Sequence, residues 1–346
     1  MEQITIKDIA RMCGCGVSTV SRALNNHPDI NEETRKKIMK VVREHDFVPN
    51  NSARNLKISD SKTIAVLIKG ISNPFFMKMV KVMEYECHKL KYSLIIQHVE
   101  FDQDEVDVAI ELEKEKRLKG IIFLGGYFNH TKEKLDKLSV PFILSTVNMT
   151  ERYSENYSSV AVDDEKESYK IVDYLCKLGH KKILLISAAP EDESIGKLRK
   201  DGYIKALLDN GIDVLDELIV PMDSKEEAYS MEAGYATMKS VLDKAVEFSA
   251  VFAISDVVSI GASRALVDAG KRIPEDVSIV GFDGIDAVRF YSPRITTIKQ
   301  PFEEMATASI KLLFEYIDGS ENIEKTQQTL FEGELILGES TAEYKG

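Results

Sequence analysis

The sequence predicts a small all-α unit followed by a larger α/β unit with two lobes. The first unit is indicated by helix-capping residues that precede short segments with apolar positions three and four residues apart. The second is indicated by short apolar runs that alternate with helix-length segments, a pattern typical of parallel sheets. We expect a helix-turn-helix domain over residues 1–50, a hinge and linker over 51–61, and a two-lobed domain over 62–346.

Two helices joined by a tight turn are expected near the start of the chain. The Thr5 side chain can accept a hydrogen bond from a free backbone N–H, and Asp8 can answer it, so a helix should run over 6–13. Two glycines permit a sharp turn, and a second helix should follow over 17–24. A third helix, capped by Asn31, should return its apolar residues to the first two.

The outward face of the second helix is suited to bind DNA. Val17 carries methyl groups that can contact thymine methyl groups, and the hydroxyls of Ser18 and Ser21 can bind phosphate. Arg22 can donate two parallel hydrogen bonds to O6 and N7 of guanine. Such an arginine, taken alone, is more often solvated or bound to phosphate, so the combination of these side chains carries the prediction.

Four motifs in this region resemble the lactose-repressor (LacI/GalR) family of bacterial regulators. They are Thr19-Val20-Ser21-Arg22, Glu33-Thr34-Arg35, Phe47-Val48-Pro49-Asn50 and Ala53-Arg54-Asn55-Leu56. The resemblance implies that the helix-turn-helix and the hinge contact DNA together. The residues that we expect at DNA are Thr5, Val17, Ser18, Thr19, Ser21, Arg22, Asn25, Asn50, Ala53, Arg54, Leu56 and Lys57.

The resemblance also implies a role for Leu56 as a wedge between base pairs at the centre of a two-fold symmetric operator. Residues 51–57 would then form a hinge helix that is too short to be stable alone and becomes ordered with the dimer and DNA. Arg54 and Lys57 would contact phosphate or the minor groove beside the wedge. The alternative for Leu56 is a linker leucine that packs on its own domain.

Cysteines and a glycine mark departures from the family pattern at the turn. Cys15-Gly16 stands where the family usually has Val-Ser, so a weaker glycine cap replaces a hydroxyl cap. Phe47 replaces the usual tyrosine before the hinge. Cys13 and Cys15 flank Gly14, and a thiol sensor or partial metal site is the alternative to two small packing residues. The six histidines lack metal-ligand spacing, so we expect no metal site and no cofactor.

Charge is distributed unevenly along the chain. The net charge is −12, yet the first 60 residues hold ten Lys or Arg against eight Asp or Glu, and the remainder holds 35 against 49. The acidic excess therefore belongs to the second domain and does not argue against DNA binding by the first. Because the sequence has no membrane-spanning apolar run, no signal-peptide pattern and only four scattered cysteines, we expect a cytoplasmic protein without membrane contact.

The second domain should contain two doubly wound α/β lobes. The expected strands fall in two series, over 63–68, 93–99, 120–124 and 141–145, and then over 183–187, 218–221, 250–255 and 277–282. A crevice is expected between the carboxyl ends of the strands, where such folds bind ligands. A dinucleotide-binding dehydrogenase is a rival, but neither glycine-rich phosphate motif follows the first strand.

Motifs in the second domain also resemble the effector domain of the LacI/GalR family, which is similar to type I periplasmic sugar-binding proteins. They are Ser72-Asn73-Pro74-Phe75-Phe76, residues 178–183, Arg199 with Gly202-Tyr203, Ser255-Asp256, residues 273–283 and residues 296–301. With the first domain, the resemblance covers residues 4–342. It implies a small-molecule effector, either a sugar or, because Phe75 and Phe76 suit a flat base, a purine.

Ten crevice residues match family pocket positions and have suitable chemistry. Arg199 can donate a forked pair of hydrogen bonds, Asp283 can accept from two hydroxyls, and Gln300 can do both. Structural ion pairing is the alternative for Arg199 and Asp283, core packing for the phenylalanines and helix capping for Asn73. The expected effector-binding residues are Asn73, Phe75, Phe76, Thr146, Arg199, Ser255, Asp256, Asp283, Gln300 and Phe302.

Two positions leave the chemical identity of the effector undetermined. Thr146 stands where many family members have an acid, and Ser255-Asp256 stands where sugar-responsive members often have Asn-Asp. Loss of the first acid allows a phosphorylated or acidic effector.

These patterns together predict a transcriptional regulator that represses carbohydrate-utilisation genes. It should bind a palindromic operator as a homodimer. Leucine heptads, which tie some family members into tetramers, do not follow Phe331. An effector should change the affinity for DNA by changing the spacing of the two hinge helices. A solute-binding protein would need an export signal and no DNA reader. An enzyme would need a nucleophile with a base or a phosphate loop in the crevice, and the sequence indicates neither.

Overall fold

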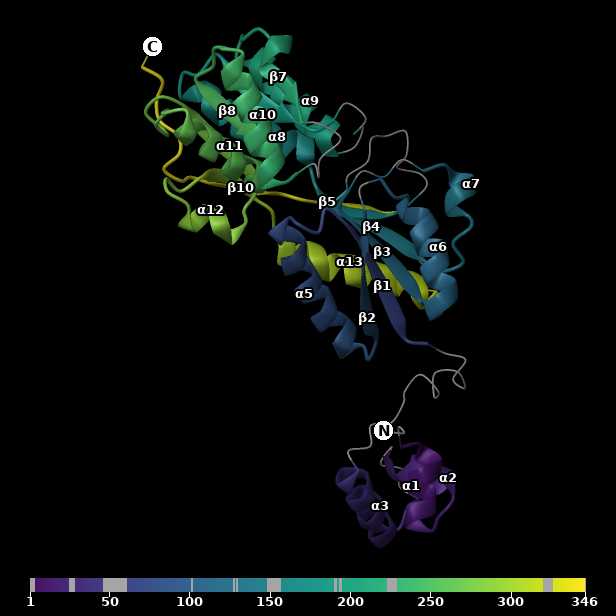
Figure 1. The fold of residues 1–346 in the computed structure, drawn as a ribbon. Helices are drawn as coiled ribbons and strands as arrows, with labels where there is room; N and C mark the ends of the chain where they lie inside the picture. Colours follow the sequence, from purple (N-terminus) through teal and green to yellow (C-terminus); the bar gives the residue numbers. More distant parts are fainter. Residues whose placement is uncertain are drawn as a thin grey trace. The chain divides into compact units, whose positions relative to one another are not determined.

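The computed structural model describes most of the chain. The described residues are 4–24, 29–45, 61–100, 102–126, 128, 130–147, 157–189, 192, 195–222, 229–319 and 326–345. The chain divides into two compact units, Met1–Ser61 and Lys62–Gly346 (Figure 1). The expected hinge helix over 51–57 lies outside the described residues, so it stays a prediction.

The first unit packs three helices around one small core. They are α1 (Ile6–Cys13), α2 (Val17–Leu24) and α3 (Glu32–Glu44). At the start of α1, the Asp8 carboxylate accepts hydrogen bonds from the backbone N–H of Thr5 at 3.0 Å and from its hydroxyl at 2.6 Å. At the start of α3, Asn31 Oδ1 accepts from the backbone N–H of Glu33 at 2.8 Å. The helices bury Ile9, Ala10, Cys13, Val20, Ala23, Ile38 and Val42 against one another.

Two six-stranded sheets form the second unit, one in each lobe (Figure 1). The first sheet has the order β11-β5-β4-β3-β1-β2 with parallel pairing throughout. Its strands are β1 (Thr63–Lys69), β2 (Ser93–Val99), β3 (Gly120–Leu124), β4 (Phe142–Ser145), β5 (Ser159–Val162) and β11 (Gln328–Phe331). The second sheet has the order β12-β10-β9-β8-β6-β7 and is parallel apart from its β10–β12 pair. Its strands are β6 (Ile183–Ser187), β7 (Ile219–Pro221), β8 (Ala250–Ala253), β9 (Ser278–Asp283), β10 (Thr296–Lys299) and β12 (Glu334–Ile336).

Helices cover the faces of both sheets. The first lobe contains α5 (Pro74–Lys89), α6 (Glu105–Lys116), α7 (Lys132–Leu135) and α13 (Phe302–Ile317). The second lobe contains α8 (Asp164–Lys177), α9 (Ile195–Asp209), the 3-10 turn η1 (Asp216–Leu218), α10 (Met231–Asp243), α11 (Asp256–Asp268) and α12 (Asp286–Phe290). None of the helices in the described part of the chain combines the length and hydropathy needed to cross a membrane.

The described chain crosses between the lobes three times. The crossings lie between β5 and α8, between β10 and α13, and between β11 and β12. After β10 of the second sheet, α13 packs against α5 and strands β3, β4 and β5 of the first lobe. At the third crossing the backbone approaches the second lobe closely, because a Cβ on Gly333 would lie 2.6 Å from Ile298 Cγ2. Asp164 follows the first crossing and Gln300 lies at the second, and both are buried.

The structure confirms the predicted fold class and corrects the list of strands. The eight expected strands are present with small shifts at their ends; the one expected over 250–255 ends at Ala253, before Ser255 begins a helix. Strands β5, β10, β11 and β12 were missed. Each has only three or four residues and includes polar ones, whereas the equally short β4, β7 and β8 are almost entirely apolar. All four adjoin a crossing, so the missed strands are those that join the lobes.

Candidate functional sites

The second helix of the first unit presents the expected DNA-contacting face to solvent. Val17 is 42% exposed, Ser18 and Arg22 are exposed, and Thr19 and Ser21 are half-buried. Val20 and Ala23 on the opposite face are buried in the three-helix core. The backbone carbonyl of Gly16 accepts from Thr19 and Val20, so glycine begins this helix without a side-chain cap. The arrangement presents a methyl, hydroxyls and a guanidinium on one face, as a helix that enters a groove of DNA would need.

The remaining expected DNA-contacting residues are Thr5, at the start of α1, and six residues outside the described ranges. The Thr5 hydroxyl donates to Asp8 within its own unit, which lowers the pKa of that carboxyl. Six of the expected contacts lie outside the described residues: Asn25, Asn50, Ala53, Arg54, Leu56 and Lys57. The wedge and the hinge therefore stay predictions.

A single buried carboxylate joins the two lobes of the second unit. Asp283, at the end of β9, is 4% exposed and adopts a left-handed φ of 121°. Its Oδ2 accepts from Asn73 Nδ2 of the first lobe at 2.8 Å, and its Oδ1 accepts from Gln300 Nε2 of the second crossing at 2.8 Å. Asn73 also caps α5, because its Oδ1 accepts from the backbone N–H of Phe75 at 3.1 Å. Helix capping and lobe contact are thus two roles of one amide.

The Arg199 guanidinium lies beside this carboxylate. Its Nε donates to Asp164 Oδ1 at 2.8 Å, one of its terminal nitrogens donates to the backbone carbonyl of Ile254, and the same nitrogen lies 3.9 Å from Asp283 Oδ1. The guanidinium carbon lies 3.7 Å from the ring centroid of Phe282. Arg199 is 5% exposed and Asp164 is fully buried. Geometry therefore places the expected arginine and aspartate together, with a second aspartate that sequence analysis did not name.

The buried cluster contains more acid groups than cations, and the pKa values of these acids are raised. Burial raises the pKa of Asp164 to about 6, although the Arg199 guanidinium acts in the opposite direction. Burial also raises the pKa of Asp283, and it raises that of Asp256 well above the ordinary value, with the Asp283 charge adding to the effect. A ligand that donates hydrogen bonds to these oxygens would stabilise their ionised forms.

Contacts within the protein favour structural roles for Ser255 and Asp256. Ser255 Oγ accepts from the backbone N–H of Val258 and so caps α11. Asp256 is fully buried, and its two oxygens accept from Thr297 Oγ1 at 2.6 Å and from the backbone N–H of Ile285 at 2.8 Å. These bonds hold β10 and the segment after β9 in place, which is the alternative to direct contact with an effector.

The three expected aromatic residues have different surroundings. Phe75 is 2% exposed and belongs to the main core, which supports the core-packing alternative. Phe76 is half-buried, and its ring fills the space beside Gly125, where a Cβ would come within 2.5 Å of the ring. The rings of Phe75 and Phe76 meet edge to face at a centroid distance of 5.7 Å. Phe302 is half-buried at the start of α13.

Two buried polar oxygens near the carboxyl ends of the strands have no hydrogen-bond partner among the described residues. One is the Thr146 hydroxyl, directly after β4, on a residue with a left-handed φ of 68°. The other is Asp164 Oδ2, at the first crossing. An unsatisfied buried polar atom is costly, so each is a group that a ligand hydroxyl could satisfy.

Sequence analysis missed Asp164 and Tyr229. Asp164 follows β5 almost directly, as Asp283 ends β9, but β5 was not recognised as a strand. Tyr229 has a left-handed φ of 62°, and its hydroxyl donates to Asp192 Oδ2 at 2.8 Å. Burial raises the pKa of Tyr229 well above its ordinary value, and the charge of Arg199 acts on it in the opposite direction, which places this phenol near the cluster. Both Tyr229 and Asp192 lie in connecting segments, where no periodicity marks a residue.

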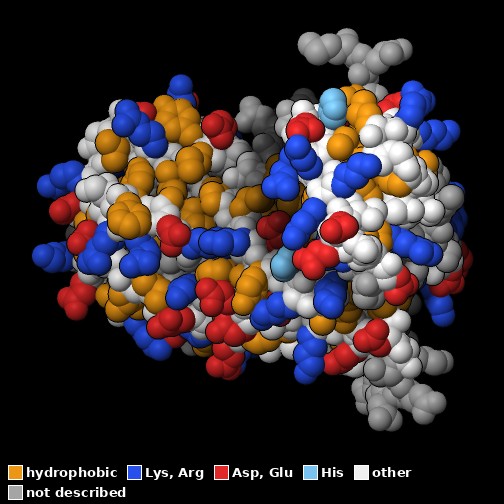
Figure 2. Space-filling model, turned by 90° about the horizontal axis from the view of Figure 1, so that it is seen from below, with side chains coloured by type: hydrophobic (Ala, Val, Ile, Leu, Met, Phe, Trp, Pro, Cys, Tyr) orange, Lys and Arg blue, Asp and Glu red, His pale blue; other side chains and the backbone are white. Residues whose placement is uncertain are grey.

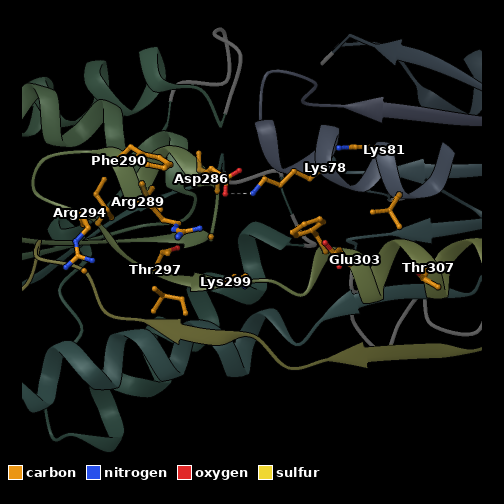
Figure 3. Close-up of a pocket in the computed structure, with 18 of the residues that line it drawn as sticks. Lys78, Lys81, Asp286, Arg289, Phe290, Arg294, Thr297, Lys299, Glu303 and Thr307 are labelled. Atoms are coloured by element: carbon orange, nitrogen blue, oxygen red, sulfur yellow. Dashed lines mark ion pairs between the residues drawn. The ribbon is translucent and has the colours of Figure 1, made fainter. Parts of the chain in front are cut away.

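A groove of about 1460 Å³ runs beside the crevice, along α5, α12 and the start of α13. Figure 2 shows Lys and Arg side chains interspersed with Asp and Glu on the face that it displays, so no single charge dominates there. In the groove, Lys78 of α5 and Asp286 of α12 form an ion pair at 2.8 Å (Figure 3). The Lys78 ammonium also lies 5.2 Å from the centroid of the Phe302 ring. Because the two helices belong to different lobes, this pair is a second polar contact across the lobes.

Of the expected effector residues, only Phe302 lines the groove. The polar cluster of Asn73, Arg199, Asp283 and Gln300 lies elsewhere, between the lobes. No group of three or more His, Cys, Asp or Glu in the described ranges is arranged to hold a metal ion.

Comparisons with known proteins agree for both units. The family described as "Bacterial regulatory proteins, lacI family" matches residues 5–50, and the "Periplasmic binding protein-like domain" matches residues 172–341. The HTH-type transcriptional regulator MalR of Clostridium butyricum is 41% identical, over 91% of this chain and 93% of its own. The HTH-type transcriptional repressor PurR of Pasteurella multocida is 31% identical, over 97% and 98%.

A solved structure extends the comparison. The LacI family transcriptional regulator from Enterococcus faecium with bound ribose is 31% identical, with a TM-score of 0.70 over 82% of this chain and all of that one. The predicted resemblance is confirmed, and the chain belongs to the lacI family of bacterial regulatory proteins.

Proposed function

We propose that this protein represses the transcription of carbohydrate-utilisation genes by binding a palindromic operator as a homodimer in the cytoplasm. The exposed face of α2 contacts the operator, and an effector between the lobes changes the affinity for DNA. The observation that carries the proposal is the meeting of Asn73, Asp283 and Gln300, which links both lobes and a crossing at one carboxylate. Binding and closure suffice for this function, and we assign it no catalytic step.

A neutral sugar fits the crevice best as effector. Sugar hydroxyls donate to carboxylates and accept from guanidinium and amide groups, and the crevice offers all three. Arg199 is already bound to Asp164 and to a backbone carbonyl, and the buried acids outnumber it. A phosphorylated or acidic effector, which the loss of an acid at Thr146 allowed, would meet uncompensated negative charge. The ribose bound to the Enterococcus relative supports a neutral sugar.

A purine corepressor is the second candidate. The neighbouring rings of Phe75 and Phe76, with centroids 5.7 Å apart, are the observation that raises it. Stacking on a flat base needs exposed aromatic faces, but Phe75 is buried in the core and only Phe76 is partly accessible. The surroundings of the two rings therefore favour the sugar.

Linkage connects the crevice to the operator. An effector that contacts groups on both lobes stabilises their closed arrangement, and the first lobe follows the DNA-reading unit directly along the chain. If the arrangement of the lobes sets the spacing of the two hinges in a dimer, the effector changes DNA affinity by the same factor by which DNA changes effector affinity. The effector and the operator then act on the same equilibrium between two arrangements of the lobes.

A two-part experiment tests this function. A thermal-shift screen of the full chain with neutral mono- and disaccharides, sugar phosphates and nucleobases should show stabilisation by a neutral sugar alone. That sugar should then change the affinity for a palindromic probe with a central CG step in a gel-shift assay. Stabilisation by a sugar phosphate would overturn the neutral effector, and stabilisation by a nucleobase would favour the purine. Failure of the protein to shift any double-stranded probe would overturn DNA binding itself.

A further inference from the structure

The turn between α1 and α2 holds two cysteines in contact. Cys13 ends α1, Gly14 follows with a left-handed φ of 64°, and Cys15 lies in the turn. The backbone N–H groups of Gly14 and Cys15 donate to the carbonyls of Arg11 and Ala10 at 3.2 and 3.1 Å, which folds the chain back on the helix end. Both side chains pack on the same three-helix core, and burial raises the pKa of the Cys13 thiol, with the neighbouring Cys15 thiol adding to the rise.

Unequal exposure gives the two thiols different chemical access. Cys13 is 3% exposed, whereas Cys15 is half-buried and open to solvent on one side. A small oxidant can therefore reach Cys15 first, and the buried Cys13 is the neighbouring thiol that can react with oxidised Cys15. Cys87 and Cys176 lie in the second unit, on α5 and α8, where burial raises the pKa of both thiols, as it does for Cys13, so Cys15 is the thiol best placed to react first.

We propose that Cys13 and Cys15 form a redox-sensitive dithiol that is oxidised by hydroperoxides to a disulfide at the turn of the DNA reader. The Cys15 sulfur attacks the peroxide, so an S–O bond forms, the O–O bond breaks and one water leaves, which gives a sulfenic acid. The Cys13 sulfur then attacks the Cys15 sulfur, an S–S bond forms, and the oxygen departs as a second water. Two thiols and one hydrogen peroxide thus yield one disulfide and two waters.

Oxidation would affect DNA binding because both cysteines lie next to the DNA-contacting helix α2. Cys13 contributes to the core that holds the three helices together, and α2 begins only two residues after Cys15. A disulfide would require the two sulfurs to rearrange around Gly14, which disturbs the end of α1 and the start of the DNA-contacting helix. The proposal makes the repressor responsive to oxidants as well as to its effector. Its effect on DNA affinity rests on the proposed function, whereas the disulfide itself does not.

Peptide mapping of the full-length protein tests the disulfide. Treatment with hydrogen peroxide should remove two free thiols and yield a peptide in which Cys13 and Cys15 are linked, and a thiol reductant should restore both. Cys15→Val keeps an apolar side chain at the turn and should retain all of its remaining thiols under the same treatment. Cys176→Ser should lose two thiols as the parent does. Persistence of four free thiols in the parent, or a sulfenic acid that never becomes a disulfide, would overturn the proposal.

Gel-shift titration tests the consequence for DNA. The oxidised parent should bind the palindromic probe roughly tenfold more weakly than the reduced parent, an effect comparable to the loss of one helix cap. Cys15→Val should bind equally well before and after peroxide. Equal binding by the oxidised and reduced parent, or equal peroxide sensitivity in Cys15→Val, would overturn the regulatory role. If the reduced parent binds no probe, the proposed function fails, while the thiol measurement still decides the disulfide.

Discussion

The two lobes contribute different chemistry to the crevice. The second lobe supplies the charges: Arg199, Asp164 and Asp283 form one buried cluster in which every charged group has a charged neighbour. The first lobe supplies neutral groups, the Asn73 amide and the Thr146 hydroxyl. Under the proposed function, this difference is a division of labour in which the second lobe binds the effector and the first lobe detects it by closing.

The charges of the first lobe are satisfied away from the effector cluster. Lys69, at the end of β1, forms an ion pair with Glu105 at 3.0 Å, and both are less than a tenth exposed. The other oxygen of Glu105 is bonded to His130 at 2.9 Å. Charges that are paired in this way hold the lobe rigid but are not free for a ligand. We therefore expect the first lobe to move as a unit, with its neutral contacts as the sensor in the proposed function.

The largest expected effect comes from removing the Arg199 guanidinium, the cation of the second lobe's cluster among the described residues. Arg199→Ala leaves Asp164 and Asp283 buried without their positive partner, so the free energy of unfolding should fall by about 3–5 kcal/mol. Effector binding should be lost as well. Urea unfolding and titration calorimetry measure the two effects. Lys205→Ala, on the exposed side of the same helix, is the matched control and should behave as the parent; equal stability of the two variants would contradict the division of labour.

A charge placed on the first lobe should weaken closure without unfolding the protein. Asn73→Asp keeps a helix-capping oxygen on α5, since Asp caps helices as well as Asn, but sets a second carboxylate against Asp283. Effector affinity should fall roughly tenfold through the like-charge contact, and the melting midpoint should fall as well, because Asn73 and Asp283 are both buried. Asn73→Ser, which keeps a cap and adds no charge, should lie between the parent and Asn73→Asp. Identical affinity for all three proteins would remove Asn73 from the sensor.

Stability should depend on pH in the mildly acidic range through Asp164 of the second lobe. Burial raises the pKa of Asp164 to about 6, above the value near 3.9 of an unfolded chain, so the folded protein binds this proton more tightly. The resulting stabilisation is fully present below the unfolded pKa and is lost as pH rises through about 6. Lowering the pH from about 7.5 to about 5.5 should therefore stabilise the parent by about 1 kcal/mol through this group.

Asp164→Asn should reduce that pH dependence, and comparing urea unfolding of parent and variant at the two pH values isolates the contribution. His180 acts in the opposite direction in both proteins, because burial lowers its pKa. An equal pH dependence in parent and variant would show that the Asp164 carboxyl does not bind the proton.

The smallest effect is expected at the groove. Lys78→Ala removes the ion pair with Asp286, whose side chains are 26% and 61% exposed, so the change in stability should stay below about 1 kcal/mol and shrink at high salt. Effector affinity should weaken slightly because the pair links the lobes. Lys81→Ala, on the same helix and in the same groove, is the matched control. A larger loss for Lys81→Ala would contradict the role of the pair.

Much of the fold could be predicted from the sequence because its signals are local. The reciprocal contact of Thr5 with Asp8 and the cap at Asn31 define α1 and α3, and the long apolar runs define the central strands. The strands that join the lobes could not be predicted, because they are short, include polar residues and are held by neighbours distant in sequence.

The candidate site was predicted in part for the same reason. Arg199, Asp283 and Gln300 meet as expected, since each lies in a motif with a family resemblance. Asp164 was missed because its strand was missed, and Tyr229 because it lies in a connecting segment. Chemistry alone could not separate a ligand-binding acid from a structural one. Asp256 illustrates this, since its two oxygens are occupied by Thr297 and by the backbone of Ile285.

The central claim is that the crevice and the operator are linked through one closing motion. The most direct measurement determines the operator affinity with and without saturating neutral sugar, and the sugar affinity with and without saturating operator, in the same buffer. The account predicts that the two fold-changes are equal and differ from one. A sugar that binds the crevice, as shown by its loss in Arg199→Ala, yet leaves the operator affinity unchanged would contradict it.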